Sequence, residues 1–554
     1  MEYERLVRQA SGGDVKAFVD LTRRFQHFAF GLALALVNDF QQAEDVVQEA
    51  FVAAWSALPG LADPAAFPGW LRGIVRHQAF RVLRRRQLRT VALTAAEDLP
   101  GDELPADHRL EWRQQATAAL AAIADLPDKL REPATLFFVH ECSHQDIAVF
   151  LDLSVATVNN RLHAARLKLK ERMLTMVTET LHSHALPDDF ANRIGRLVAA
   201  REGIIEALFD PNAPPDILTE LTVSDEANRR AVTVQVVQRP GPGIVRGVAA
   251  SPIDAVPRGS TVLSSGRQSE RPVNLDEFAR IVPLLAGPMP TAVGLGKPIE
   301  TGIKVIDVMC PLFAGASVAI VGEARVGIVV VTEELVKRLS GGLDRVSLFS
   351  LVPLPPNLPP DWSFAEELKK EAGSEGTIGP VQTFFLRGED RPWSRDHLAA
   401  LAAAVDIIIH LSRERIRANI YPAVDVLTSR SRLIENKTVS KEHLMITERV
   451  RQTIAALWMA PHPKSSGDNL MLERALKLQN YFTQPFFIAE PYTKRPGASV
   501  TAAEALRTCA DILDGNYDDL PTEAFFFSGD VTEIRGNVGR TLKFGPVTPP
   551  SLPQ

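Results

Sequence analysis

The sequence predicts a multidomain protein, in which all-α helical domains with a helix-turn-helix are followed by a small β-barrel, an α/β domain and a C-terminal helical domain. Three observations lead to this prediction. Apolar residues recur at three- and four-residue spacing up to about position 180, short alternating runs follow from Arg196 to about Pro272, and strand, loop and helix patterns succeed one another after Ile299. A chain of 554 residues is also too long for a single hydrophobic core.

The bulk composition is that of an ordinary globular protein. A net charge of −6 argues against a surface that coats nucleic acid uniformly, although it allows local basic patches. Cys142, Cys310 and Cys509 lack paired spacing, the N-terminus gives no signal-peptide pattern, and the longest apolar run, ten residues, falls short of the ~20 that span a bilayer. We therefore expect a cytoplasmic protein without a membrane span. His140, Cys142 and His144 alternate, but no fourth ligand is near, so we interpret them as a loop and expect no metal site.

Two helices in the first ninety residues have side chains that suit binding. Residues 45–55 form an acidic amphipathic pattern, which suits docking on a partner protein. Residues 70–86 form a basic helix with interleaved aromatic residues, in which Arg can contact phosphates while Trp or Phe stacks on an unpaired base. The alternative is an ordinary solvated basic surface. The candidate DNA contacts on this helix are Trp70, Arg72, Arg76, Phe80, Arg81, Arg84 and Arg85.

Residues 143–166 predict the helix-turn-helix. Ser143 can cap the first helix, Asp152 and Leu153 form the turn, and Ser154 can cap the second helix. In this motif the N-terminal end of the second helix enters the major groove of DNA. The alternative is an ordinary helical hairpin. The candidate base contacts are Thr157, Asn159, Asn160 and Arg161, and the candidate phosphate contacts are His163, Arg166, Lys168 and Lys170.

These segments resemble the extracytoplasmic-function sigma factors of bacterial RNA polymerase, within the sigma-70 family. The matching stretches are residues 44–51, 67–71 and 146–162, in the family's order over about the first 175 residues. Asp152 stands where the family usually has Gly, and Asp tolerates a left-handed turn. The resemblance implies that residues 45–55 bind the polymerase clamp, that the basic helix opens the minus-ten promoter element, and that the helix-turn-helix reads the minus-thirty-five element. The implied polymerase contacts are Asp45, Gln48, Glu49, Phe51 and Trp55.

From Gly195 to Gly536 the chain is similar to the beta subunit of rotary ATP synthases. The resemblance implies an N-terminal β-barrel, a P-loop (RecA-like) nucleotide-binding domain and a C-terminal helical domain. The matching stretches are residues 195–198, 245–247, 300–307, 420–425 and 484–486. The expected boundaries are a core-binding and minus-ten-reading helical domain 1–92, a linker 93–122, a helix-turn-helix domain 123–180, the barrel 192–282, a degenerate P-loop domain 283–440, the helical domain 441–540 and a Pro-rich tail 541–554.

The phosphate loop has the glycine spacing of an ATPase without its chemistry. Ile328 and Val329 stand where a Lys would neutralise phosphates and a hydroxyl would hold Mg²⁺. Leu354 stands where the catalytic Glu is expected, and the stretch with the metal-side Asp is missing. Losing one such group typically costs ~10²–10³ in rate. We therefore predict a pseudo-ATPase with no catalytic residues and no required cofactor.

A degenerate adenine-nucleotide site is the remaining candidate in this part. The resemblance places Tyr421, Tyr481 and Phe486 where the family stacks adenine, but we favour core packing for these rings, because aromatic residues mostly serve packing. If they still form a pocket, weak adenine-nucleotide binding without turnover is expected, with Arg325 partly replacing the missing Lys. The candidate residues are Gly322, Arg325, Gly327, Tyr421, Tyr481 and Phe486.

Three functions compete at this stage. The favoured one is a sigma-like transcription factor, regulated by the pseudo-ATPase through masking of its DNA contacts, sensing of a nucleotide or binding of a regulatory protein. The second is an ATP-binding ring subunit with accessory helices, which the altered phosphate loop argues against. The third is a non-catalytic scaffold, which the well-formed basic and helix-turn-helix patterns argue against.

Overall fold

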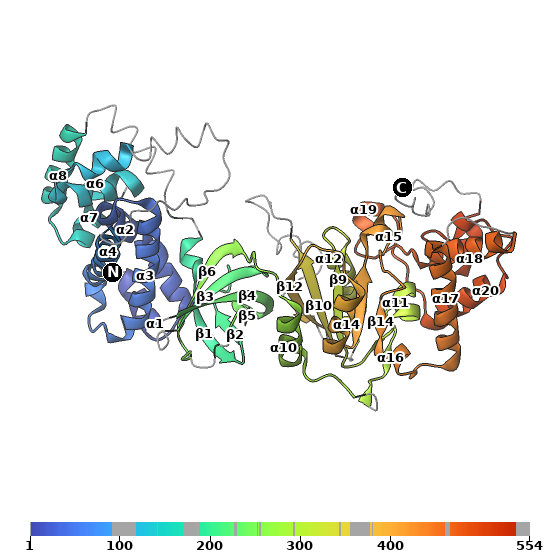
Figure 1. Cartoon of the computed structure of the whole chain (residues 1–554). Helices are drawn as coiled ribbons and strands as arrows, with labels where there is room; N and C mark the ends of the chain where they lie inside the picture. The colour runs from blue at the N-terminus through green and yellow to red at the C-terminus, as the bar shows by residue number, and fades with distance from the viewer. Residues whose placement is uncertain are drawn as a thin grey trace.

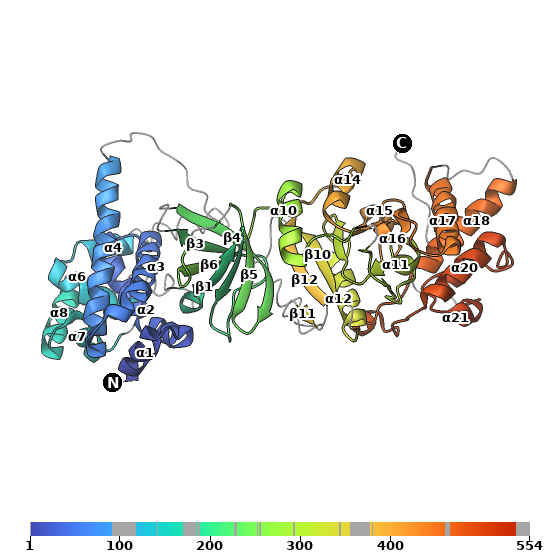
Figure 2. The same cartoon turned by 90° about the horizontal axis from the view of Figure 1, so that it is seen from below.

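The computed structural model places a helical unit at one end of an elongated molecule and a second group of helices at the other, with a closed β-barrel and a six-stranded sheet between them (Figures 1 and 2). Among the residues described, no helix is long and apolar enough to cross a membrane. The structure describes residues 2–90, 118–140, 142–169, 186, 189–225, 230–251, 253, 256–291, 294–342, 345–354, 377–378, 381–459 and 466–538.

The N-terminal helices pack around the apolar helix α2. Asp14 caps this helix by accepting a hydrogen bond from the backbone N–H of Ala17, and α2 then contacts α3, α4 and α6. The helices are α1 (Glu2–Ser11), α2 (Val15–Val37), α3 (Phe40–Ala57), α4 (Phe67–Thr90), α6 (Asp128–His140), α7 (His144–Leu151) and α8 (Val155–Lys168), with 3-10 turns η1 (Leu58–Gly60) and η2 (Pro64–Ala66).

The two predicted helical domains of this part share one hydrophobic core. Leu136 of α6 lies so close to Gly31 of α2 that a Cβ atom at Gly31 would come within 2.8 Å of it. The ring of Phe150 in α7 lies 5.3 Å from the ring of Phe28 in α2. The described N-terminal helices therefore form one packed unit, although the sequence predicts two helical domains joined by a linker. Most of that linker, residues 91–117, lies outside the described residues.

The barrel is a closed antiparallel sheet with the strand order β1-β2-β5-β4-β3-β6. The alternating pattern predicted from the sequence is present, since Ile205, Leu221, Val234 and Val245 are fully buried in its interior. The 3-10 turn η3 (Phe190–Arg193) leads into it. Its strands are β1 (Ile194–Arg201), β2 (Ile204–Leu208), β3 (Thr219–Asp225), β4 (Arg230–Gly241), β5 (Ile244–Ala249) and β6 (Thr261–Gln268).

The α/β domain is built on a six-stranded sheet with the order β11-β12-β10-β9-β13-β14. Its four inner strands run parallel, and the short edge strands β11 and β14 are antiparallel. The central strands β9 and β13 are nearly continuous apolar runs because both faces of the sheet are covered. The strands are β9 (Ser317–Gly322), β10 (Val346–Pro353), β11 (Thr377–Ile378), β12 (Val381–Gly388), β13 (Ile407–Leu411) and β14 (Arg430–Ser431), with a separate pair β7 (Pro298–Ile299) and β8 (Leu312–Phe313).

Helices cover both faces of this sheet and then form the C-terminal end of the molecule. α10 and α14 pack on one face, where the ring of Phe278 lies 5.7 Å from that of Phe349, and α12 packs on the other face. The helices of the sheet domain are α10 (Leu275–Ala286), α11 (Lys304–Met309), α12 (Ile328–Leu339), α14 (Arg395–Ala404), α15 (Arg413–Arg417) and α16 (Arg432–Glu435). The remaining helices are α17 (Lys441–Met459), α18 (Ser466–Phe482), α19 (Glu490–Thr493), α20 (Ala502–Asp514), η5 (Thr522–Phe525) and α21 (Val531–Gly536).

The order of helical, barrel, α/β and helical parts agrees with the prediction from the sequence. One predicted boundary differs: the barrel ends with β6, and α10, which falls within the predicted barrel range 192–282, packs against α14 of the next domain. The predicted Pro-rich tail lies outside the described residues. A P-loop (RecA-like) fold for the α/β domain stays a prediction.

Candidate nucleic-acid interface and ligand pocket

The local structure of residues 143–166 is that of two capped helices joined by a tight turn. The Ser143 and Ser154 hydroxyls each accept a hydrogen bond, at 3.1 Å, from the backbone N–H groups of Asp146 and Thr157 respectively. Asp152 ends α7 in the left-handed conformation at φ 58°, as predicted for a residue in place of Gly. Both predicted N-caps and the turn are therefore present.

α8 leaves most of its candidate DNA contacts accessible. Asn159, Asn160, His163, Arg166 and Lys168 are exposed, whereas Thr157 and Arg161 are half-buried. The Thr157 hydroxyl lies 2.7 Å from the Ser154 hydroxyl, and the Arg166 guanidinium lies 5.0 Å from the centre of the Phe137 ring. Lys170 lies outside the described residues. The N-terminal half of α8 thus presents amide side chains that can pair with base edges.

α4 carries exposed cationic and aromatic residues toward its C-terminal end. Phe80 is 59% exposed, an unusual position for a large aromatic ring, and Arg81 and Arg84 beside it are exposed. Arg81 donates a hydrogen bond to Gln78. Trp70 is half-buried and packs against the Phe67 ring at 5.8 Å. The side chain of Arg85 is outside the described part of the structure.

Two of the predicted DNA contacts on α4 are instead paired within the helical unit. The Arg72 guanidinium donates to the backbone carbonyl of Phe150 in α7 at 3.0 Å. The Arg76 guanidinium donates to both carboxylate oxygens of Glu132 in α6, at 2.7 and 2.8 Å. Both arginines therefore join α4 to the helices that precede and form the helix-turn-helix, and the charge of Arg76 is paired with Glu132 in this arrangement.

α3 has both surface and core residues among its predicted polymerase contacts. Asp45 and Glu49 are exposed and Gln48 is half-buried. Desolvation, together with the neighbouring carboxylates of Glu44 and Glu49, raises the pKa of Asp45.

Phe51 and Trp55, also predicted to contact polymerase, lie in the hydrophobic core instead of on the surface of α3. Phe51 is fully buried and Trp55 is 8% exposed, with its ring 4.0 Å from that of Phe18. Their spacing along α3 places both on its apolar face, which α2 covers.

The barrel packs against α2 and α3 beside these acidic residues. Arg23 of α2 pairs with the buried carboxylate of Asp210 at 3.2 Å and also donates to Asn192. Arg193 lies 3.7 Å from Glu44 of α3, and the Phe190 ring packs against that of Phe51 at 6.3 Å. No pattern in the sequence predicts this interface, because its residues are spread over four separate segments.

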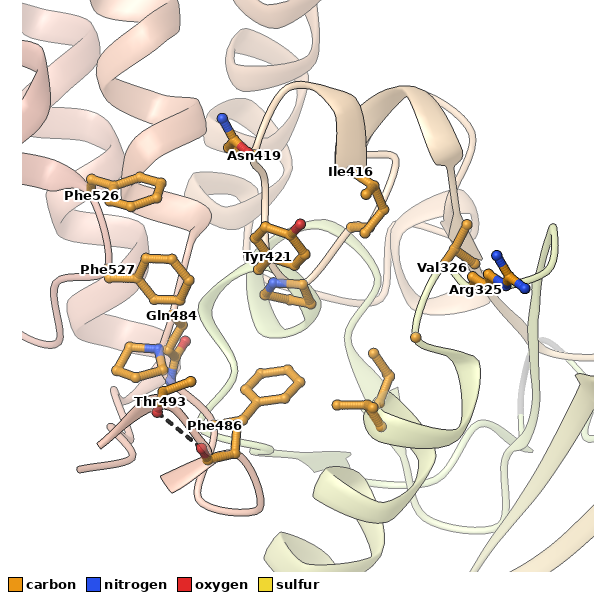
Figure 3. A pocket seen from close by; sticks show the side chains of 17 residues that line it. Arg325, Val326, Ile416, Asn419, Tyr421, Gln484, Phe486, Thr493, Phe526 and Phe527 are labelled. Carbon is orange, nitrogen blue, oxygen red and sulfur yellow. Dashed lines mark hydrogen bonds between the residues drawn. The ribbon is translucent and has the colours of Figure 1, made fainter. Parts of the chain in front are cut away.

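A largely apolar pocket of about 400 Å³ lies between the α/β domain and the C-terminal helices. Figure 3 shows the rings of Tyr421, Phe486 and Phe527 around the same space. Arg325, Gly327, Tyr421 and Phe486 were predicted for this site. The lining residues that sequence reasoning missed include Val330, Ile416, Asn419, Phe526 and Phe527. The triple Phe at 525–527 was a signal that could have found two of them.

Two predicted residues of the degenerate nucleotide site lie elsewhere. Tyr481 is fully buried and packs against the Lys304 ammonium, which lies 4.2 Å from its ring centre, while burial raises the pKa of its hydroxyl. Gly322 is not a lining residue but permits close packing, since a Cβ there would come within 2.5 Å of the Leu411 carbonyl oxygen. Core packing therefore accounts for Tyr481 but not for Tyr421, which is 42% exposed and lines the pocket.

The phosphate-loop segment beside this pocket does not fit a magnesium-bound triphosphate. Ile328 is buried and, with Val329, opens α12 where a cation and a hydroxyl would be required. The backbone N–H of Ala324 donates to the carboxylate of Asp390 at 2.9 Å. Arg413 is shared between Asp390, at 3.4 Å, and Glu323 of the loop, at 3.5 Å. Two carboxylates thus lie at this loop, with Arg413 as their shared counter-ion.

Two family models match the N-terminal part of the chain. Residues 21–89 match the model described as Sigma-70 region 2, which spans α2 to nearly the end of α4. Residues 116–169 match the model described as Sigma-70, region 4, which includes α6, α7 and α8. The N-terminal part of the chain therefore carries the two domains of a sigma-70 family factor, which confirms that part of the predicted resemblance. Similarity of the rest to an ATP synthase beta subunit stays a prediction.

Proposed function

We propose that this chain is a transcription initiation factor of the extracytoplasmic-function type. Its sigma-70 region 2 and region 4 domains are the part that acts in initiation. It binds bacterial core RNA polymerase and promoter DNA in the cytoplasm. The observation that carries the proposal is the exposed N-terminal half of α8 in a capped helix-turn-helix, within the segment that matches region 4. The exposed Phe80 and Arg84 of α4 support the minus-ten role, because an aromatic ring beside cations can stack on an unpaired base.

The remaining two thirds of the chain act as a non-catalytic regulatory module in this proposal. Its support is the contact of the barrel with α2 and α3, through Arg23, Asp210 and Arg193, next to the acidic residues that would bind polymerase. The altered phosphate loop supports the absence of ATP turnover. An ATP-binding ring subunit finds no support in that loop, because Ile328 and Asp390 oppose phosphate binding.

Promoter binding requires the helical unit to open. The minus-ten and minus-thirty-five elements are named by their positions, so they lie about 25 base pairs apart. That separation is roughly 85 Å of duplex at ~3.4 Å per base pair. Arg72 and Arg76 of α4 contact α7 and α6 directly. The described arrangement is therefore a closed one, and the two promoter-reading domains separate when polymerase and DNA bind.

The test is run-off transcription with core polymerase, the full chain and fragmented genomic DNA, followed by sequencing of the transcripts. We expect discrete start sites that share a promoter motif. A double variant Asn159→Ala/Asn160→Ala should lose initiation by about 10-fold or more, because a good base contact is worth ~1–3 kcal/mol. Asn436→Ala, at an exposed residue after α16 of the α/β domain, is the control. A folded chain that neither initiates nor binds core polymerase would refute the proposal.

A further inference from the structure

The exposed face of α8 carries apolar and amide side chains in its first two turns. These exposed residues are Val155, Ala156, Asn159 and Asn160. The Ser154 hydroxyl caps the first of the two turns, so the start of the helix is fixed. Figures 1 and 2 show α8 at the outer end of the helical unit, on the side away from the barrel. This face of the helix is therefore open to a DNA duplex.

No Arg or Lys is exposed between residues 155 and 165, all of which the structure describes. Arg161 is the only Arg or Lys in this stretch, and it is half-buried beside the buried Leu162. At roughly 100° per residue, Arg161 is turned about 200° away from Asn159. His163 follows on the exposed face, among the side chains predicted to meet phosphates. The first exposed Arg is Arg166, which lies roughly 10 Å along the helix from Asn159.

The chemistry of this face matches A·T pairs seen from the major groove. An Asn amide can donate to N7 of adenine and accept from its N6 amino group, and an apolar side chain can contact the thymine methyl group. At a G·C pair the amide oxygen would face the guanine acceptors O6 and N7, and an apolar side chain would leave the cytosine amino group without a partner. Guanine is read chiefly by Arg or Lys, which this face lacks.

We propose that the first two turns of α8 select neighbouring A·T pairs in the minus-thirty-five element and discriminate against G·C there. Asn159 and Asn160 each bind an adenine, and Val155 contacts a thymine methyl group. The two amides meet different bases, because adjacent residues of a helix are turned by roughly 100° from one another. The inference rests on the proposed function, since it names the bases that the helix-turn-helix of this initiation factor reads.

The test is transcription of a barcoded promoter library by core polymerase with the full chain. The library is built on a promoter found by transcript mapping, with its minus-thirty-five bases randomised and each sequence tied to a barcode in the transcribed region. We expect enrichment of at least two neighbouring A·T pairs, and a change of either one to G·C should lower initiation at least about fivefold. Initiation without such a preference would overturn this inference and leave the proposed function standing. A folded chain that gives no initiation would overturn both.

A substitution at Asn160 assigns one base contact to its side chain. Asn160→Ala should flatten the preference at one A·T pair to less than about twofold and leave the preferences at the other positions, because only one amide is lost. Asn436→Ala, at an exposed Asn of the α/β domain, is the matched control and should change none of them. Equal loss of initiation from every promoter in the library would mean that Asn160 is only structural, and would overturn its assignment.

Removal of a single methyl group tests the contact of Val155, which is 42% exposed. Deoxyuridine is placed instead of thymidine at each thymine of the selected element in turn. At one of them initiation should fall about three- to fourfold, as expected for one methyl group lost from an apolar contact. Val155→Ser should make the two promoters equal, whereas Val155→Ile should keep the difference. Equal initiation at every position in the unmodified chain, or an unchanged difference in folded Val155→Ser, would overturn the thymine contact.

Discussion

At the scale of single residues, the candidate DNA contacts fall into two groups: side chains that are exposed, and side chains that already bind another part of the protein. Asn159 and Asn160 are exposed and free to meet base edges. Arg76 has the charge for a phosphate contact, but its guanidinium spans both oxygens of Glu132. Both hydrogen bonds come from one guanidinium nitrogen, Nη2, and hydrogen bonds between ionised groups are stronger than those between neutral ones. DNA must therefore compete with Glu132 for Arg76.

Replacing Glu132 by Gln should increase promoter binding by the full chain about two- to fivefold. The change removes the ion pair that holds Arg76 on α6, and a partly exposed pair is worth roughly 0–1 kcal/mol. Fluorescence anisotropy with a promoter duplex would measure it. Asp128→Asn is the matched control, because it removes the same charge from the same helix, where Asp128 pairs with Arg131 at 3.1 Å. An equal gain in both variants would mean that only net charge matters.

At the scale of elements, α3 and the loop before α12 each combine a predicted local shape with side chains whose surroundings differ from the prediction. α3 keeps the acidic surface predicted for polymerase binding, but Phe51 and Trp55 belong to the core under α2. The loop keeps Gly327 in a left-handed conformation, φ 90°, which allows β9 to turn into α12. The glycine turn is thus present, and Ile328 and Val329 after it carry neither a charge nor a hydroxyl.

We predict that ATP hydrolysis by the purified chain is indistinguishable from buffer. The double variant Ile328→Lys/Val329→Thr should also remain inactive, because Asp390 still occupies the loop N–H and Leu354 stands in place of the catalytic Glu. A phosphate-release assay across purification fractions would measure both. Mg²⁺-dependent activity that co-purifies with the chain would contradict the assignment as a pseudo-ATPase.

At the scale of the whole molecule, the helical unit is closed on itself and joined to the barrel. Phe190 and Ile194, at the start of the barrel, belong to the same core as α2 and α3. A cut near residue 190 would therefore remove part of that core. The boundary between the promoter-reading part and the rest lies inside a packed interface, where the sequence predicts a change of domain.

A chain that ends after Gly195 should initiate more transcription than the full chain, because it keeps Phe190 and Ile194 but loses the barrel strands beside α3. Arg193→Ala in the full chain should give a smaller rise, since it removes the ion pair with Glu44 of α3, together with the local pair with Asp189, but leaves the barrel in place. Single-round run-off transcription measures both, with circular dichroism to confirm folding. A folded but inactive truncation would show that the C-terminal part is required for initiation.

The sequence by itself determined the order of the parts, the capped helix-turn-helix with Asp152 in its turn, and the absence of a charge or hydroxyl at Ile328 and Val329. These are local properties, since a cap, a left-handed turn or a missing charge depends on neighbours along the chain. Only the tertiary structure decided that Arg76 is paired, that Tyr481 is buried while Tyr421 is open, and that Phe527 joins a pocket. The physical reason is that periodicity identifies an apolar or charged face, whereas its burial and its partner depend on segments distant in sequence.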